Sequence, residues 1–267
     1  MKLIRFLNMT FTGLLAYTLW ACDTIKEEDR LIYVQPAEVN RSVLIEDFTG
    51  QRCVNCPTAT EEIEKLQSQY GEDNVIAVAI HGGYFGIYTS TSAVTALSTE
   101  EAREYYDKWN IDSQPAGVVN RRSGVTNYTA WAAAIHNELQ KQTPVSMSLN
   151  TTFDNTSNTL QVKTSILSTQ KLNCKLQLWL TEDGVKALQL MPDGSPNLEY
   201  IHHNVYRKSV NGLWGTEIAL SESQVEATFA TTIDSKWQIA NMHVVAFVYN
   251  QEGVLQVTKQ KIINKKT

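Results

Sequence analysis

The feature that most constrains this chain is a pair of cysteines, Cys53 and Cys56, that stands between a predicted strand and a predicted helix. The preceding run, residues 42–48, is largely apolar and predicts a buried strand. Pro57 then opens a helical pattern that ends near Gly71, and proline suits the first helical turn because its missing N–H would have had no partner there. A CxxC motif in this context indicates redox chemistry.

The chemistry follows from the position of the two sulfurs at the start of the helix. The unpaired N–H groups of the first turn carry partial positive charge, which favours the thiolate form of Cys53. Cys56 follows one turn later on the same side and can close a disulfide. Cys53 would attack a substrate disulfide and Cys56 would resolve the mixed intermediate. A structural disulfide is the main alternative, since secreted proteins tolerate one readily. A zinc site needs about four ligands, and the sequence has no second CxxC and no HxxxH.

Other candidate side chains are assessed by position. His81 follows the apolar run 75–80 and would end a strand at the same edge as the CxxC, where it could stabilise a thiolate or donate a proton; the alternative is a loop residue before two glycines. His202 and His203 are adjacent, so on a strand they would point to opposite faces and make a poor joint metal site. Cys174 lies in a predicted strand and is expected to be a buried free thiol.

The first residues are typical of a bacterial export signal. Lys2 and Arg5 precede an uncharged stretch that runs to Cys22, and this stretch is short for a membrane-spanning helix. The end of the stretch, Leu19-Trp-Ala-Cys22, resembles the lipobox of bacterial lipoproteins, in which the cysteine is lipidated and becomes the mature N-terminus. The alternative is an ordinary cleaved signal with an incidental cysteine. Acyl chains on Cys22 would hold a soluble domain at a bilayer.

Residues 22–37 are polar and predict a solvated tether. Lys26-Glu-Glu28 resembles the acidic export tag of surface lipoproteins in Bacteroidetes, whereas Asp23 resembles an inner-membrane retention signal of enterobacteria. We favour a lipid-anchored protein of the outer membrane, facing either the periplasm or the cell surface.

The rest of the chain divides near residue 143. Residues 38–143 alternate strand and helix patterns, with helices predicted over 100–109 and 128–141, which indicates an α/β domain. From Pro144 to residue 267 alternating strands separated by turn signals predict an all-β, immunoglobulin-like sandwich. The predicted strands of this second domain cover residues 145–153, 159–167, 171–180, 225–233, 241–250 and 254–261.

Composition excludes several classes of function. Hydrophobic residues make up 43% of the chain and charged residues 19%, which are ordinary values for a globular protein. Only one long apolar run occurs, so a polytopic membrane protein is excluded. The formal net charge of -5 provides no basic surface for nucleic acid.

Residues 42–142 resemble the thioredoxin fold. Asp47 lies six positions before Cys53, on the strand where thioredoxins carry a buried carboxylate implicated in proton transfer from the resolving cysteine. Pro115 precedes a strand where thioredoxins place a cis-proline against the active-site sulfurs. The sequence departs from that pattern at Gln51-Arg52, which replaces the usual aromatic run before the first cysteine. The Val-Asn spacer leaves the roles of oxidant, reductant and isomerase open.

The whole mature chain resembles the Bacteroidetes outer-membrane lipoprotein family known as outer-membrane protein twenty-eight. Besides the lipobox, the resemblance rests on Glu46-Asp-Phe-Thr-Gly50 leading into the CxxC, on Tyr200-Ile-His-His-Asn-Val-Tyr-Arg207 and on Asn211-Gly-Leu-Trp-Gly215. It implies a thioredoxin-like domain, a β-rich C-terminal module and an outer-membrane location.

Two functions are therefore expected in competition. The first is an envelope thiol–disulfide oxidoreductase acting on proteins or peptides without an organic cofactor or metal; Cys53 is the nucleophile, Cys56 the resolver, Asp47 the proton relay and Pro115 the substrate-docking residue. The second is a non-catalytic surface module in which the disulfide only braces the scaffold. Aromatic residues would then bind a peptide, a glycan or a transporter partner: Tyr84, Phe85, Tyr88, Trp179 and Trp214. The sequence leaves the oligomeric state open.

Overall fold

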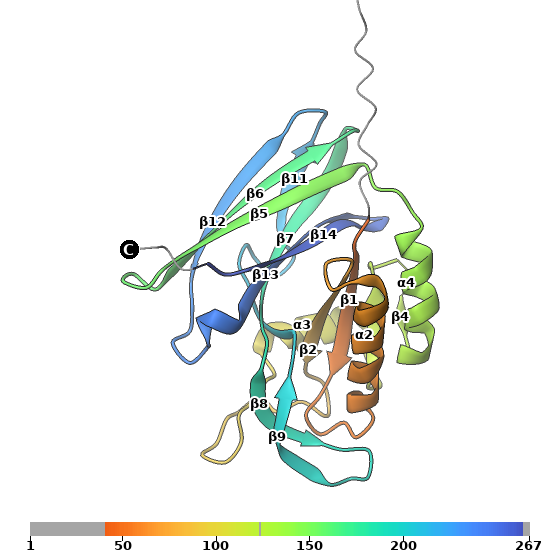
Figure 1. Ribbon diagram of the computed structural model, residues 1–267, viewed down its shortest axis with the longest axis vertical. Helices are drawn as coiled ribbons and strands as arrows, with labels where there is room; N and C mark the ends of the chain where they lie inside the picture. The colour runs from red at the N-terminus through yellow and green to blue at the C-terminus, as the bar shows by residue number, and fades with distance from the viewer. Residues whose placement is uncertain (1–40, 123, 264–267) are drawn as a thin grey trace, which may run out of the picture. The chain divides into compact units, whose positions relative to one another are not determined.

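The computed structural model describes residues 41–122 and 124–263 (Figure 1). Cys22, at which the sequence predicts lipidation, and the predicted export signal and tether lie outside the described residues. Up to residue 139 the described chain alternates strands and helices: β1 (Val43–Thr49), α2 (Cys56–Tyr70), β2 (Val75–His81), α3 (Glu100–Trp109), β3 (Ala116–Val119), β4 (Val125–Thr126), a short 3-10 helix (Tyr128–Ala130) and α4 (Trp131–Leu139).

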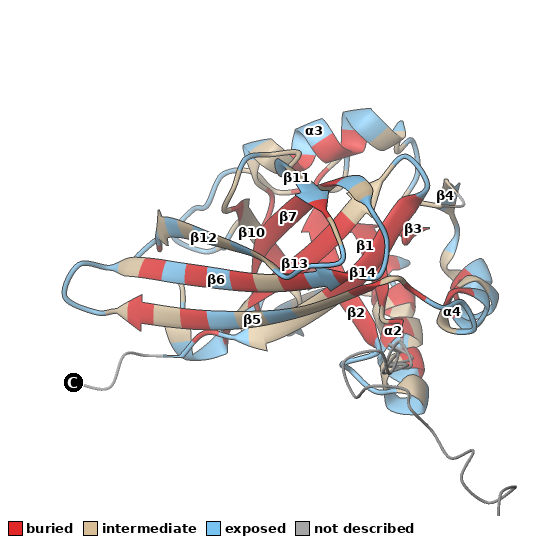
Figure 2. Cartoon of the chain, turned by 90° about the horizontal axis from the view of Figure 1, so that it is seen from above, coloured by how far each residue is buried: buried red, intermediate tan, exposed pale blue. Residues whose placement is uncertain are grey.

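The central strands β1 and β2 are buried along their whole length, as Figure 2 shows. Their apolar side chains alternate between two faces, and each face has its own cover. Residues of α2 and α4 pack on one face in a cluster that includes Ile63 and Trp131. Residues of α3, including Tyr105, pack on the other face. This double cover explains why both strands read as continuous apolar runs.

Helix α3 has the bounds that the sequence predicts, because both of its ends carry local signals. The side chain of Thr99 caps its first turn by accepting a hydrogen bond of 3.1 Å from the N–H of Ala102. Asn110 takes the left-handed conformation that ends it. Helix α4 is shorter than the predicted range 128–141, because its first residues form the 3-10 turn that Asn127 caps.

The remaining chain is built of strands. They are β5 (Val145–Asp154), β6 (Thr159–Ser168), β7 (Leu172–Glu182), β8 (Val185–Leu190), β9 (Pro196–His202), β10 (Val205–Ser209), β11 (Thr216–Leu220), β12 (Val225–Thr232), β13 (Met242–Asn250) and β14 (Gly253–Lys261), with a 3-10 turn at Ile239–Asn241. The six strands expected after residue 144 are confirmed to within a few residues. Strand β4 and the four strands between residues 185 and 220 were not predicted.

One sheet joins both parts of the chain. Its strand order is β14-β13-β7-β10-β2-β1-β3-β4, with β11 also paired to β7. The connection is made where β10 runs parallel to β2, with Val205 opposite Ala79. The N–H of Ala79 donates to the carbonyl oxygen of Asn204 at 2.8 Å. The residue 143 boundary falls in the loop between α4 and β5, yet strands β7, β10, β11, β13 and β14 from beyond it share a sheet with β1 to β4.

A second, three-stranded sheet of order β12-β6-β5 completes the β-rich part. Alternate side chains of β6 are buried, among them Leu160 and Val162, and they pack with Leu178 of β7 and Val244 of β13 in one apolar cluster. The two sheets therefore enclose a core between them, as expected of a sandwich. No helix among the described residues is long and apolar enough to span a membrane.

Candidate functional site

The two cysteines of the CxxC motif form a disulfide at the start of α2. Their Cα atoms are 5.4 Å apart, and the N–H of Cys56 donates to the carbonyl oxygen of Cys53 at 3.3 Å. Pro57 occupies the first turn of α2, which holds no acidic residue, and Asn55 before it makes no side-chain capping bond. The positive end of the helix dipole is therefore not neutralised locally, which favours negative charge on a sulfur placed there.

A β-hairpin covers this disulfide. Strands β8 and β9 form a two-stranded sheet of their own, which Figure 1 places beside the end of β1 and the start of α2. The side-chain amide of Gln189 in β8 donates to the carbonyl oxygen of Cys53 at 2.9 Å, and the N–H of Leu190 donates to that of Gln51 at 2.9 Å. Cys53 and Cys56 are each only 2% exposed.

The buried side chain of Gln51 links the hairpin to the CxxC loop. Its side-chain amide donates to the carbonyl oxygens of Leu188 at 3.2 Å and of Thr95 at 2.9 Å, and its side-chain oxygen accepts from the N–H of Leu97 at 3.0 Å. One side chain thus holds the CxxC loop, the hairpin and the segment after β2 together. An amide suits this position because it donates and accepts at once.

Pro115 is buried at the same end of the sheet, although Asp112 and Ser113 before it are exposed. The Gln114–Pro115 peptide bond is cis, and Pro115 directly precedes β3. The side-chain amide of Gln114 donates to the carbonyl oxygen of Gly82 at 3.2 Å and to the hydroxyl of Tyr106 at 2.8 Å. Gly82 in turn donates its N–H to Thr49 at 3.0 Å. The ends of β1 and β2 and the cis-proline loop are therefore tied into one cluster.

Asp47 lies on β1 beneath α2 and is 2% exposed. Its Oδ1 atom has no hydrogen-bond partner among the described residues. Burial raises the pKa of this carboxyl to about 7, because a charge there is poorly solvated. Asp47 can therefore both hold and release a proton near neutral pH.

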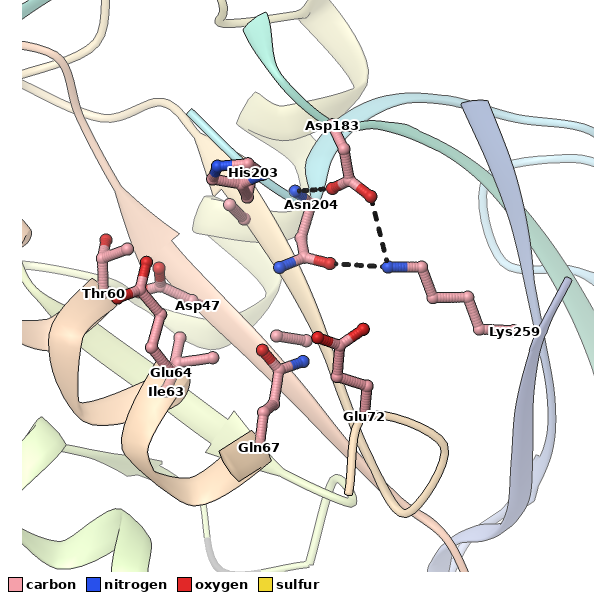
Figure 3. A pocket seen from close by; sticks show the side chains of 12 residues that line it. Asp47, Thr60, Ile63, Glu64, Gln67, Glu72, Asp183, His203, Asn204 and Lys259 are labelled. Atoms are coloured by element: carbon pink, nitrogen blue, oxygen red, sulfur yellow. Dashed lines mark hydrogen bonds and ion pairs between the residues drawn. The ribbon is translucent and has the colours of Figure 1, made fainter. Parts of the chain in front are cut away.

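A cavity of about 220 Å³ reaches Asp47 (Figure 3). One wall is the face of α2 that carries Thr60 and Glu64. The opposite wall comes from the β-rich part, where the ammonium group of Lys259 lies 2.9 Å from the side-chain oxygen of Asn204 and 3.6 Å from a carboxylate oxygen of Asp183. This cavity gives water a route to a carboxyl that is otherwise enclosed.

His81 ends β2, and its ring contacts the ring of His202 at the end of the hairpin. Its Nε2 atom lies 3.3 Å from Nδ1 of His202, and both rings are buried. Burial lowers the pKa of His202 to about 4 and that of His81 well below its usual value. Both rings are neutral near pH 7, so His81 brings no positive charge to the site there. His203, by contrast, is exposed and lines the cavity near Asp47.

The remaining candidates from the sequence are the two other cysteines and a possible metal site. Cys174 is a buried free thiol of β7, and burial raises its pKa. Cys22 lies outside the described residues. Within residues 41–122 and 124–263, no group of three or more His, Cys, Asp or Glu side chains is placed to hold a metal ion.

The β8–β9 hairpin was not predicted from the sequence, and neither was the role of Gln189 or the contact of His202 with His81. A signal was present. The turns Glu182-Asp-Gly184 and Pro192-Asp-Gly194 bracket the six residues of β8, which is the pattern of a strand entering a hairpin.

Comparison with known proteins identifies relatives of this chain. A family model described as outer membrane protein Omp28 matches residues 102–266. The match covers more than half of the chain but begins after the two cysteines. No curated protein matches the sequence.

Two solved structures share the fold. HBP35 of Porphyromonas gingivalis superposes with a TM-score of 0.66 at 16% identity, over 84% of this chain and 76% of that one. Protein AGR_C_4864 from Agrobacterium tumefaciens superposes with a TM-score of 0.52 at 16% identity, over 86% of this chain and 98% of that one. At this level of identity the similarity concerns the fold alone.

Proposed function

The chain belongs to the Omp28 family of outer membrane proteins, and we propose that it is a lipid-anchored member that performs thiol–disulfide exchange in the cell envelope. The anchor would be Cys22, at the end of the signal segment. The exchange would be carried out by a thioredoxin-like domain of residues 38–143. Its substrates would be proteins or peptides with cysteines of their own.

The thioredoxin-like assignment rests on topology. The strand order β2-β1-β3-β4, with β1 parallel to β2 and antiparallel to β3, is the order of the thioredoxin sheet. The CxxC stands between β1 and α2, and a cis-proline precedes β3. The fold similarity to HBP35 supports the same assignment.

The exchange would balance as follows. In the reduced protein the Cys53 thiolate attacks one sulfur of a substrate disulfide and releases the other sulfur as a thiolate. Cys56 then loses its proton to the Asp47 carboxylate and attacks Cys53, which re-forms the protein's disulfide and releases the second substrate thiolate. Two electrons pass to the substrate. The reverse sequence oxidises a substrate dithiol.

One observation carries this proposal: a buried carboxyl with an unpartnered oxygen stands at Asp47 with a pKa of about 7. Burying such a group costs stability, and carboxyls with a pKa raised in this way are concentrated at functional sites. A disulfide that only braces the fold has no need of it. The hairpin would have to move aside for a substrate to reach Cys53, because the sulfurs are almost fully covered.

The test is an insulin-reduction assay on the full chain in detergent, with dithiothreitol as electron donor. We expect the wild type and a Cys174→Ser control to reduce insulin faster than the donor alone, and Cys53→Ser to lose that rate. Equal rates for the wild type and Cys53→Ser would refute the proposal. Mass spectrometry of the same preparation tests the anchor, since Cys22→Ser should lack the mass of the acyl chains.

The burial of the disulfide favours a second candidate, a binding module in which the Cys53–Cys56 bond is structural. The reduction potential separates the two. A potential near about -200 mV fits exchange, whereas one below about -300 mV fits a structural disulfide.

A further inference from the structure

A groove away from the disulfide runs over the sheet where β7, β11 and the β13–β14 turn meet, next to the end of α3. Its volume is about 1190 Å³, whereas pockets for drug-sized molecules usually hold about 300–1,000 Å³. It therefore has room for a ligand of several linked units. We call it the β7–β11 groove; the residues that matter for its chemistry are Trp109, Trp214, Tyr249, Lys175, Glu217 and Glu252.

Three aromatic rings line the β7–β11 groove, and all three are partly exposed. Neighbouring contacts fix two of them. The hydroxyl of Tyr249 donates to the carbonyl oxygen of Trp214 at 2.6 Å, and the Trp214 ring packs edge-to-face on Tyr105 with centroids 5.0 Å apart. The third, Trp109, stands at the end of α3. The Arg121 guanidinium lies over the Tyr249 ring, 4.6 Å from its centroid. Trp109 and Trp214 are therefore the rings that can offer an apolar face to a ligand, unlike the fully buried Trp179.

Polar side chains stand beside the rings. Lys175 of β7 is paired across the sheet with Glu217 of β11 and with Tyr249 of β13. Residues paired in this way share one face of the sheet, so an ammonium, a carboxylate and an aromatic ring form one row. Glu252, from the β13–β14 turn, adds a second carboxylate.

The charges of the groove balance. Lys108 and Lys175 are matched in number by Glu217 and Glu252. The remaining cation, Arg121, is neutralised by the buried carboxylate of Glu46, whose Oε1 lies 2.5 Å from its Nε. The groove therefore presents no strong field of either sign, which disfavours a phosphate or another polyanion as its ligand.

We propose that the β7–β11 groove binds a neutral oligosaccharide. A sugar ring has an apolar C–H face that stacks on an aromatic ring, and its hydroxyl groups both donate and accept. The carboxylate of Glu217 and the ammonium of Lys175 would make charge-assisted hydrogen bonds with those hydroxyls. The volume of the groove suits a chain of several sugars.

An extended peptide fits the groove less well. Peptides that bind on sheets usually add to an unpaired strand edge. Strand β7, in the floor of the groove, is already bonded to β11 and to β13. A peptide could therefore add only to the outer edge of β11, two strands away from Tyr249 of β13. The oligosaccharide site does not involve the disulfide, so a test of sugar binding and a test of thiol exchange have independent outcomes.

The test uses the full chain in detergent with six hexasaccharides: maltohexaose, cellohexaose, laminarihexaose, xylohexaose, mannohexaose and N-acetylchitohexaose. Binding is followed by tryptophan fluorescence and by calorimetry. We expect at least one sugar to bind and quench the fluorescence. Trp109→Ala should weaken that binding at least about tenfold, since a stacking face is lost. Trp237→Ala is the matched control, because Trp237 is a partly exposed tryptophan that does not line the groove.

Glu217→Gln is the second variant. It removes one charge from an exposed strand position and should leave the fold intact. It therefore tests the proposal even if Trp109→Ala fails to fold. We expect it to weaken sugar binding at least about threefold. The proposal is overturned if none of the six sugars binds, if binding is equal in the wild type and the groove variants, or if an unstructured decapeptide pool binds the groove and the sugars do not.

Discussion

The side-chain amide of Gln189 donates a hydrogen bond of 2.9 Å to the carbonyl oxygen of Cys53. Gln189 belongs to the β8–β9 hairpin, and it is as buried as the cysteine that it contacts. Together with the bond from the N–H of Leu190 to Gln51, this contact keeps the hairpin over the disulfide. Access to the sulfurs should therefore depend on how firmly the hairpin is held.

Gln189→Ala should speed reduction of the Cys53–Cys56 disulfide by dithiothreitol. A lost buried hydrogen bond costs about 1–2 kcal/mol, which corresponds to roughly five- to thirtyfold in the population of an open hairpin. The rate is measured by alkylating free thiols with iodoacetamide at timed intervals. Mass spectrometry then gives the fraction of protein that carries the label. Gln69→Ala, an exposed glutamine of α2, is the control. Equal rates in the two variants would contradict a covering role for the hairpin.

Asp47→Asn should stabilise the protein at pH 8 and have little effect at pH 4. The carboxyl of Asp47 has a raised pKa of about 7 in the fold, against about 3.9 in an unfolded chain. Its contribution to stability is thus full below about pH 4 and is lost as the pH rises through 7, because the unfolded state has already released the proton. Asparagine cannot ionise and escapes this loss.

The gain for Asp47→Asn at pH 8 should approach about 4 kcal/mol as an upper limit. Urea unfolding at the two pH values gives the difference, with Asp73→Asn, at an exposed loop position, as the control. A gain for Asp47→Asn of the same size at both pH values would show that the carboxyl does not titrate as described.

The His202 ring should titrate with a midpoint near pH 4. Burial lowers its pKa to about 4, whereas an unperturbed histidine titrates near about 6.5. The neutral contact with His81 therefore contributes its full stability above about pH 6.5 and loses it as the pH falls toward 4. The Cε1–H resonance of His202 in an NMR titration reports the midpoint. A midpoint close to 6.5 would mean that the ring is exposed and that the hairpin is not docked.

Arg121→Leu should destabilise the fold by about 3–5 kcal/mol, because it leaves a buried carboxylate without its partner. The side chains of Arg121 and Glu46 are 6% and 0% exposed, with Nε and Oε1 2.5 Å apart. The double variant Glu46→Leu with Arg121→Leu should recover most of the loss. Denaturant unfolding measures the three free energies.

The control for the Arg121 prediction is Lys163→Ala, which breaks an exposed ion pair with Glu226 and should cost less than about 1 kcal/mol. A loss in Arg121→Leu as small as that of the control would show that the buried pair does not contribute to stability.

The sequence by itself was sufficient for the local parts of this protein. Strand β2 could be predicted because both of its faces are covered and its residues are apolar without interruption. Helix α3 could be predicted because Thr99 and Asn110 mark its two ends. The choice of Cys53 and Cys56 followed from their spacing, and that of Asp47 and Pro115 from the resemblance to thioredoxins, so these members of the candidate site were named before their geometry was known.

Partners far apart along the chain could not be chosen in this way. His81 and His202 are 121 positions apart, so no local sequence pattern links them. Gln189 carries no motif, and its role arises only because the hairpin folds over the CxxC loop. Strands β8, β9 and β11 are only partly buried, so their alternation is weak, and the turns on either side of β8 were the remaining signal.

What the amino-acid order determined is therefore most of the elements and the pair of cysteines, since helix caps, apolar periodicity and the CxxC spacing all act within about one turn or one strand. What only the tertiary structure decided is how those elements meet. The parallel pairing of β10 with β2 joins both parts of the chain in one sheet, and the hairpin buries the disulfide. The hydrogen bonds between distant strands cannot be predicted from local periodicity. They join backbone groups that every strand carries, so the side-chain pattern of one strand does not specify its partner.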